Sequence, residues 1–105
     1  KAVISNNYAG LPIEFSLSQN FPNPFNPVTK IAFALPQEGL VNLAIYDLMG
    51  REVQNLVSSR SMGGNYSVNW NATNRYGSKV STGIYFYSLT VDDKMISSHK
   101  MILMK

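Results

Sequence analysis

Tyr85-Phe86-Tyr87-Ser88-Leu89-Thr90-Val91, with the two aspartates that follow it, is the stretch that decides the fold. Tyr85, Tyr87, Leu89 and Val91 fall at every second position, which is the side-chain period of a β-strand. Asp92-Asp93 then precedes another apolar stretch, and Asp favours tight turns by bonding its own backbone. The sequence predicts a β-hairpin here, with the aspartates as its turn and not as a calcium site.

The second stretch of this hairpin keeps its strand periodicity to the last residue. In an extended chain Met101 and Leu103 share one face, while Ile102 and Met104 share the other, so both faces carry large apolar side chains. Chain ends usually fray and carry polar residues. We therefore expect the terminal segment to be tied into a sheet, recognised by a partner, or both.

Similar alternation recurs upstream in short blocks that are separated by Gly- and Pro-containing turns. The predicted strands cover residues 14–17, 31–35, 41–45, 52–57, 66–70, 85–91 and 94–104. The imperfect alternation of 52–57 is typical of an edge strand or a bulge. Seven strands without a helix favour an all-β, immunoglobulin-like antiparallel sandwich over a barrel. Its predicted interior comprises Ile31, Phe33, Leu43, Ile45, Val68 and Trp70.

Composition limits the classes of function. Charged residues make up 14% of the chain and hydrophobic residues 45%, which suits one ordered domain. The net charge of +3 comes from nine scattered Lys and Arg, so nucleic-acid binding is not predicted. No apolar run approaches the ~20 residues of a membrane-spanning helix, and we expect no direct membrane insertion. The absence of cysteine excludes disulfides, thiolate zinc sites and Cys nucleophiles.

Neither an enzyme nor a cofactor site is predicted. The single histidine, His99, lies in an expected strand and is interpreted as an exposed strand residue, while the Asp and Glu residues are dispersed. The sequence contains no nucleophile turn around a serine that would support catalysis. One candidate function is that of an accessory module of an exported enzyme, which binds carbohydrate or a cell surface. Its aromatic platform would consist of Tyr66, Tyr76, Tyr85, Phe86 and Tyr87.

The chain reads as a piece of a longer protein, because it begins without an initiator Met or a signal segment. Residues 1–12 contain Asn, Gly and Pro without a sustained period. We expect residues 1–13 to be a linker to an upstream parent domain and residues 14–105 to be the β-sandwich.

Three sequence blocks, residues 19–29, 45–53 and 77–87, precede the terminal residues 100–105 in a fixed order. Over residues 15–105 the chain closely resembles the type A C-terminal sorting domain of the type IX secretion system. It is similar, more weakly, to the immunoglobulin-like domain of flagellar hook-capping proteins. The residues that match the family motif are Asn23, Pro24, Phe25, Asn26, Pro27, Gly50, Arg51, Gly83 and Tyr85. Ala72 departs from the family, which often has Gly there, and this puts the local turn geometry in question.

The resemblance implies a non-catalytic signal at the end of an exported cargo protein. The type IX translocon of the outer membrane would recognise the domain, and a sortase-like protease would cut in or beside residues 1–12. The cargo would pass through the periplasm to the cell surface or the medium. The family's sorting signal corresponds to Lys100, Met101, Ile102, Leu103, Met104 and Lys105.

The Asn-Pro block has a physical interpretation of its own. Pro24 and Pro27 lack backbone donors and restrict the residues before them. They predict a rigid, non-pairing crossover, with Phe25 folded inward as a lid on the sandwich. The block is either a stiff corner or a docking element. We expect the terminal strand to present a free edge to which a partner adds by β-augmentation.

Overall fold

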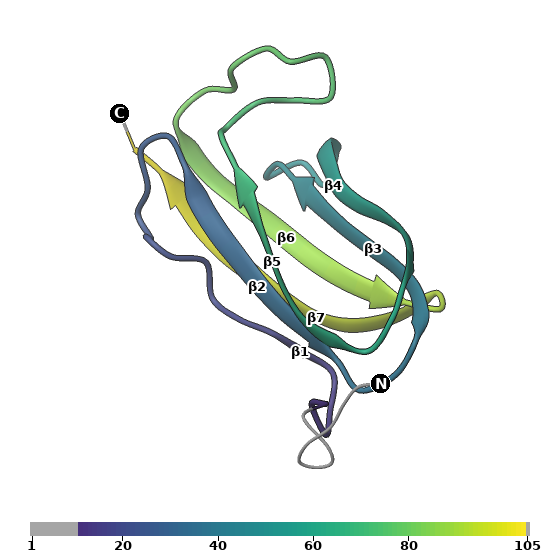
Figure 1. Ribbon diagram of the computed structural model, residues 1–105. Coiled ribbons are helices and arrows are strands. Elements are labelled where there is room, and N and C mark those ends of the chain that lie inside the picture. The colour runs from purple at the N-terminus through teal and green to yellow at the C-terminus, as the bar shows by residue number, and fades with distance from the viewer. Residues whose placement is uncertain (1–10, 105) are drawn as a thin grey trace.

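The computed structural model describes residues 11–104, which form two antiparallel β-sheets packed face to face (Figure 1). One sheet has three strands in the order β1-β2-β5, and the other has four in the order β4-β3-β6-β7. The strands are β1 (Ser16–Leu17), β2 (Thr29–Leu35), β3 (Gly39–Tyr46), β4 (Glu52–Ser61), β5 (Gly64–Trp70), β6 (Gly83–Val91) and β7 (Lys94–Leu103). The predicted seven-stranded sandwich is confirmed. Residues 11–104 contain no helix, and therefore none that could cross a membrane.

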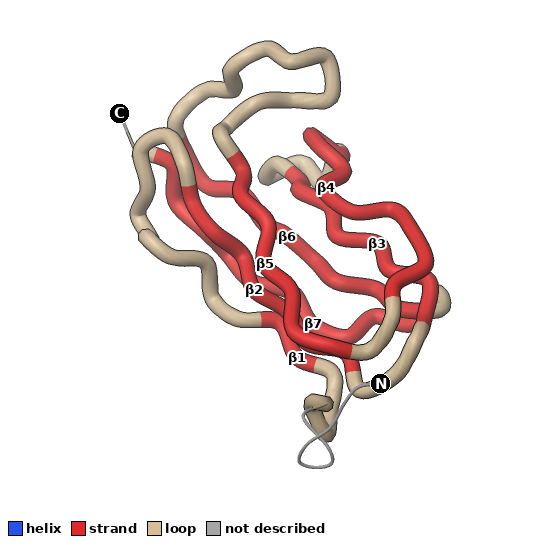
Figure 2. Tube along the Cα trace, in the orientation of Figure 1, coloured by secondary structure: helices blue, strands red, loops and turns tan. Residues whose placement is uncertain are grey.

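The longest loop between strands covers residues 71–82 and joins β5 to β6 at the end of the sandwich where the chain terminates (Figure 2). The β6–β7 turn at the opposite end is tight. Asp92 and Asp93 have φ angles of 51° and 66°, the left-handed conformation that a two-residue hairpin turn of type I′ requires at both positions. The turn predicted from the two aspartates is therefore confirmed.

The core lies between the sheets and is centred on Trp70, which is 1% exposed. Its ring lies 5.8 Å from that of Phe25 and 5.5 Å from that of Tyr85, measured between centroids. Of the six residues predicted inside, only Val68 is not fully buried. It packs against the core from β5, which is an edge strand of the three-stranded sheet and is covered less completely than a central strand.

β4 forms one edge of the four-stranded sheet. Its pairing with β3 shifts register twice, between Leu43 and Ala44 and between Ile45 and Tyr46. None of its ten residues is fully buried. The irregular edge strand predicted here is confirmed, because bulges of this kind disrupt the alternation of buried and exposed side chains.

Candidate functional site

The terminal strand β7 combines a docked face with an exposed one. Met101 is completely buried and Leu103 is 5% exposed. On the other face Lys100, Ile102 and Met104 are exposed. The two-faced pattern predicted for the chain end is therefore confirmed over residues 100–104; Lys105 lies outside the described residues.

The outer edge of β7 is occupied by the loop of residues 19–27. On its inner side β7 pairs with β6. On its outer side, backbone groups of Lys100, Ile102 and Met104 bond to the loop. Their partners in the loop are two side chains and the backbone of Phe25. The bonds are Gln19 Nε2 to Lys100 O (2.9 Å), Ile102 N to Asn23 Oδ1 (3.0 Å), Phe25 N to Ile102 O (3.0 Å) and Met104 N to Phe25 O (2.9 Å).

Two expectations about this region are wrong. The Asn-Pro block is not a non-pairing crossover, since Phe25 forms a parallel bridge with Leu103. Pro24 and Pro27 do lack N–H groups, but Phe25 between them keeps both its donor and its acceptor. For the same reason the edge of β7 is not free over residues 100–104. A partner strand cannot pair there unless the loop moves away.

The loop is held by its own contacts as well. Phe25 is 2% exposed and packs on Trp70, so its predicted role as a lid on the sandwich is confirmed. Asn20 is buried, and its Nδ2 donates to Thr29 Oγ1 at 2.9 Å. Both Asn20 Nδ2 and Thr29 Oγ1 donate to Pro22 O. A buried polar network whose members are satisfied fixes the loop in one conformation.

Most of the residues predicted to match the family motif surround the terminal strand. Gly83 and Tyr85 of β6 lie directly opposite Leu103 and Met101 of β7. The Tyr85 hydroxyl donates to Ser81 O at 2.6 Å, which fixes the end of the long loop. The motif residues near the terminal strand are Asn23, Pro24, Phe25, Asn26, Pro27, Gly83 and Tyr85. Asn26 and Pro27, with Leu103 and Met104, line an open pocket of about 470 Å³.

Gly50 and Arg51 lie apart from this group, in the turn between β3 and β4. Gly50 has a φ of 82°, a conformation that favours glycine. The Asp47 carboxylate accepts hydrogen bonds from the backbone N–H groups of Met49 and Arg51 and from Arg51 Nε. The hydrogen bond from the Arg51 backbone N–H is the main reason why the pKa of Asp47 lies below its ordinary value. These contacts give the turn a defined shape.

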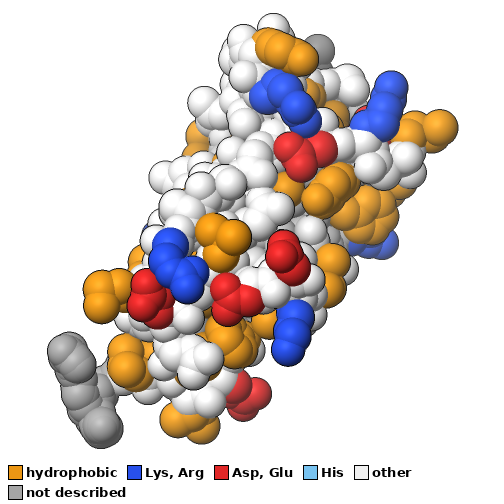
Figure 3. All heavy atoms as spheres, turned by 90° about the vertical axis from the view of Figure 1, so that its right-hand side faces the viewer, with side chains coloured by type: hydrophobic (Ala, Val, Ile, Leu, Met, Phe, Trp, Pro, Cys, Tyr) orange, Lys and Arg blue, Asp and Glu red, His pale blue; other side chains and the backbone are white. Residues whose placement is uncertain are grey.

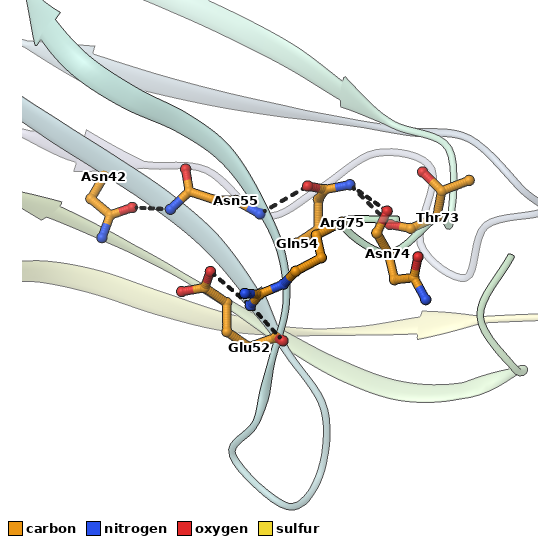
Figure 4. Close-up of polar contacts among 7 residues, drawn as sticks. All are labelled: Asn42, Glu52, Gln54, Asn55, Thr73, Asn74 and Arg75. Carbon is orange, nitrogen blue, oxygen red and sulfur yellow. Dashed lines mark hydrogen bonds and ion pairs between the residues drawn. The ribbon is translucent and has the colours of Figure 1, made fainter. Parts of the chain in front are cut away.

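The long loop of residues 71–82 is tied to the β4 edge by polar contacts (Figure 4). Gln54 Nε2 donates to Asn74 O at 2.9 Å and more weakly to Thr73 O. Arg75 bonds both the backbone O and the carboxylate of Glu52. From the core side, Trp70 Nε1 donates to Thr73 O at 2.8 Å. Sequence reasoning missed Gln54, as it missed Gln19, since a single amide side chain carries no periodic signal.

A second open pocket, of about 600 Å³, lies between this loop and the β3–β4 turn. Arg51, Glu52 and Arg75 line it, as do Leu48 and Ile84. The side of the molecule facing the viewer in Figure 3 carries acidic and basic side chains next to each other. The ion pairs among the described residues are Arg51–Asp47, Arg60–Glu38 and Arg75–Glu52. Exposed pairs of this kind contribute little to stability.

His99 is half-buried, so its interpretation as an exposed residue is wrong. Its Nε2 lies 2.7 Å from Leu17 O, and because a carbonyl only accepts, this nitrogen carries the proton. The two-residue strand β1, which approaches β7 from the other sheet, causes the burial. The ring of Tyr87 lies beside that of His99. Within residues 11–104 no three His, Asp or Glu side chains are grouped to hold a metal ion.

The aromatic platform of the carbohydrate-binding alternative does not form. Tyr85 and Tyr87 point into the core, and Tyr66 stacks on Phe33 at 5.2 Å. Only Tyr76, at 83%, and Phe86, at 36%, expose much of their rings. Consecutive strand residues alternate between faces, so Phe86 and its two tyrosine neighbours cannot share one surface.

Comparisons with known proteins agree with this arrangement. The model of the family described as the secretion system C-terminal sorting domain matches residues 19–104. No curated protein matches the chain.

Three solved structures share the fold. Dimeric latent PorU from Porphyromonas gingivalis has a TM-score of 0.71 and 23% identity, over 88% of this chain and 10% of that one. PorZ, a surface component of the type IX secretion system of the same organism, has a TM-score of 0.53 and 19% identity, over 87% of this chain and 11% of that one. The hook-capping protein FlgD from Xanthomonas campestris has a TM-score of 0.58 and 25% identity, over 85% of this chain and 66% of that one.

The chain spans about a tenth of the PorU and PorZ chains that it matches. The family model, by contrast, covers most of the present sequence. The chain belongs to the family of secretion system C-terminal sorting domains, non-catalytic signal domains that direct exported cargo through type IX secretion.

Proposed function

We propose that residues 100–105 are the sorting signal of this domain and that the type IX translocon recognises them on the folded sandwich. One observation carries the proposal. The terminal strand is anchored by Met101 and Leu103, and the loop of residues 19–27 holds its edge, yet Lys100, Ile102 and Met104 stay exposed. A fixed backbone with exposed side chains suits recognition, because little conformational entropy is lost on binding.

The rest of the proposal concerns the parent protein. Residues 1–13 join an upstream cargo domain to the sorting domain of residues 14–105. A sortase-like protease cuts in or beside residues 1–12, and the cargo travels through the periplasm to the cell surface or the medium. The exposure of Ile13, at 93%, and the first strand at Ser16 support a boundary near residue 13. Residues 1–10 lie outside the described residues.

The test is a fluorescent reporter placed between a Sec signal peptide and this chain, expressed in a host with type IX secretion. Deleting the terminal residues would be ambiguous, because Met101 and Leu103 belong to the core. The double substitution Lys100→Glu, Lys105→Glu avoids this problem, because it keeps both core residues and because the charge at Lys100 is exposed and contributes little to folding. We expect it to lower the exported fraction about tenfold or more, as loss of a binding anchor does.

Lys94→Glu is the matched control, because Lys94 is also exposed and lies at the other end of β7. Its export should equal that of the parent chain. Unchanged export of the double variant would contradict the proposal. Mass spectrometry of the released reporter would locate the cut, and a cut after residue 20 would contradict the proposed boundary.

A further inference from the structure

A mostly apolar surface lies on the outer face of the four-stranded sheet, next to the chain end. We call it the outer stripe; it comprises Ile84, Phe86, Lys100, Ile102 and Met104. Ile84 lies directly opposite Ile102, and Phe86 directly opposite Lys100. Opposed residues on one face of antiparallel strands have Cβ atoms about 5 Å apart. The four paired side chains therefore form one surface, and Met104 follows Ile102 at the next exposed position of the chain.

The apolar side chains of this surface are partly exposed and adjacent to one another. Ile84, Phe86 and Ile102 are each 36% exposed, and Met104 is 52% exposed. Single exposed apolar residues are common, but a contiguous group on two paired strands indicates an interaction site. The stripe also continues, through Ile84, into the pocket beside the β3–β4 turn.

The backbone next to the stripe is not available to a partner. The outward-facing groups of residues 100, 102 and 104 are bonded to the loop of residues 19–27. Strand addition at this edge would first have to break those bonds. Recognition in the closed state therefore falls to the side chains of the outer face.

The positive charge of Lys100 restricts which kind of partner can cover the stripe. Lys100 takes part in none of the ion pairs among residues 11–104. The carboxylates of Asp47 and Glu52, which line the same pocket as Ile84, are each already paired with an arginine. A surface that covers Ile84, Phe86 and Ile102 would desolvate this ammonium group, and burying a charge is costly unless it is paired. The complementary partner therefore offers a carboxylate among apolar side chains.

We propose that the outer stripe is the docking surface through which a protein of the secretion machinery, with a carboxylate set among apolar side chains, binds the folded domain. This inference rests on the proposed function and extends it. Ile84 and Phe86 precede the terminal segment by about fifteen residues, so the signal is a composite of two strands. It exists only when β6 and β7 are paired.

The test uses Ile84→Ser, Phe86→Ser in the same reporter fusion, because neither residue belongs to the terminal segment. Its control is Leu40→Ser, Met95→Ser, which removes two apolar side chains that are more exposed and lie near the opposite end of the same sheet. We expect the stripe variant to lose about tenfold or more of its export, a typical effect for two central apolar contacts. The control should retain export. Circular dichroism melting of both purified chains checks that they remain folded.

The outcomes separate this inference from the proposed function. Loss of export in Lys100→Glu, Lys105→Glu with normal export of the folded stripe variant would overturn the docking surface alone. Normal export of both would contradict the sorting signal itself. A second copy of the chain is the competing occupant. A dimer in light scattering that the stripe substitutions dissociate would overturn the inference, whereas a monomeric parent chain supports it.

Discussion

The four-stranded sheet ends in two edge strands, β4 and β7, whose surroundings differ. β4 is irregular, with two register shifts, and it is bordered by polar contacts from Gln54 and Glu52 to the loop of residues 71–82. Residues 97–103 of β7 pair with β6 in a regular register, next to the edge that the loop of residues 19–27 covers. This part of β7 contributes Met101 and Leu103 to the core. Unpaired edges invite association with other chains. β4 limits this hazard by its irregular shape, and β7 by being covered.

The difference matters for function because a covered edge can be regular. Bulges would disturb the alternation of side chains that gives β7 a docked and an exposed face. The loop of residues 19–27 removes the need for them. The part of β7 that carries the proposed signal thus keeps a regular register with β6, and the shift in that pairing, between Leu89 and Thr90, lies toward the other end of the strand. β4, which carries no proposed signal, has two register shifts against β3.

Trp70 connects the two edges, and its replacement should have the largest effect. Its ring contacts Phe25 on the β7 side, and its Nε1 donates to Thr73 O in the loop attached to β4. Trp70→Ala should lower the free energy of unfolding by about 3–5 kcal/mol, a large part of a typical stability. Urea denaturation measures this. Trp70→Phe, which keeps most of the buried area, should cost much less, and equal losses would contradict the packing described.

Phe25→Ala should affect the β7 edge alone. We expect a loss of about 3 kcal/mol in the free energy of unfolding, since the ring is buried against Trp70. The amides of Ile102 and Met104, which bond to the loop, should exchange faster with solvent, while those of β4 should not.

Phe21 provides the control within the same loop, because its ring is 79% exposed. Phe21→Ala should change stability by less than about 0.5 kcal/mol, as surface substitutions usually do. Faster exchange along both edges of the Phe25→Ala variant would contradict the separate protection of the two strands.

The buried hydroxyl of Tyr87, on the β7 side of the molecule, predicts that folding stability depends on pH. Its hydroxyl donates to Ser18 O ahead of the covering loop, and burial raises the pKa of Tyr87 to about 12. The unfolded chain loses this proton near pH 10. Stability should therefore be unaffected by this group below pH 10 and should fall between pH 10 and 12, by up to about 2 kcal/mol.

Tyr87→Phe isolates the effect, because it removes the hydroxyl whose pKa is raised and keeps the buried ring. The variant should lose about 1 kcal/mol at neutral pH with the hydrogen bond to Ser18 O. Its stability should then fall less than that of the parent chain between pH 10 and 12. Parallel pH curves for the two chains would contradict the raised pKa.

Local patterns in the sequence predicted much of this fold. Period-two stripes located most of the strands, and the Asp92-Asp93 turn was recognisable because Asp tolerates the left-handed conformation. Trp70 and Phe25 were placed inside on size and apolar character. These features depend on residues close in sequence or on burial, which composition and periodicity report directly.

The pairing of Phe25 with β7 was not predictable in the same way. It joins residues nearly eighty positions apart through backbone groups that every residue type except proline possesses. The flanking prolines even argued against pairing. The burial of His99 was missed for a related reason, because it depends on β1, a strand of two residues from the other sheet.

Ala72 gives the smallest predicted effect and concerns the β4 side, where it starts the loop of residues 71–82. It is a non-glycine residue at φ 63°, and its methyl group is buried. The left-handed conformation costs an L-residue about 1–2 kcal/mol, so glycine would relieve strain at this position. Glycine would also lose about 0.8 kcal/mol of methyl burial and about 0.5–1 kcal/mol of backbone entropy.

These contributions nearly cancel, and Ala72→Gly should change the free energy of unfolding by less than about 0.5 kcal/mol. Ala44→Gly is the matched control, because Ala44 is equally buried in β3 but does not have a positive φ. It gains no relief of strain and should be destabilised by about 1–2 kcal/mol. Urea denaturation of both variants measures the difference. Equal losses would mean that the start of the loop is not strained and that the methyl group of Ala72 contributes only through its packing.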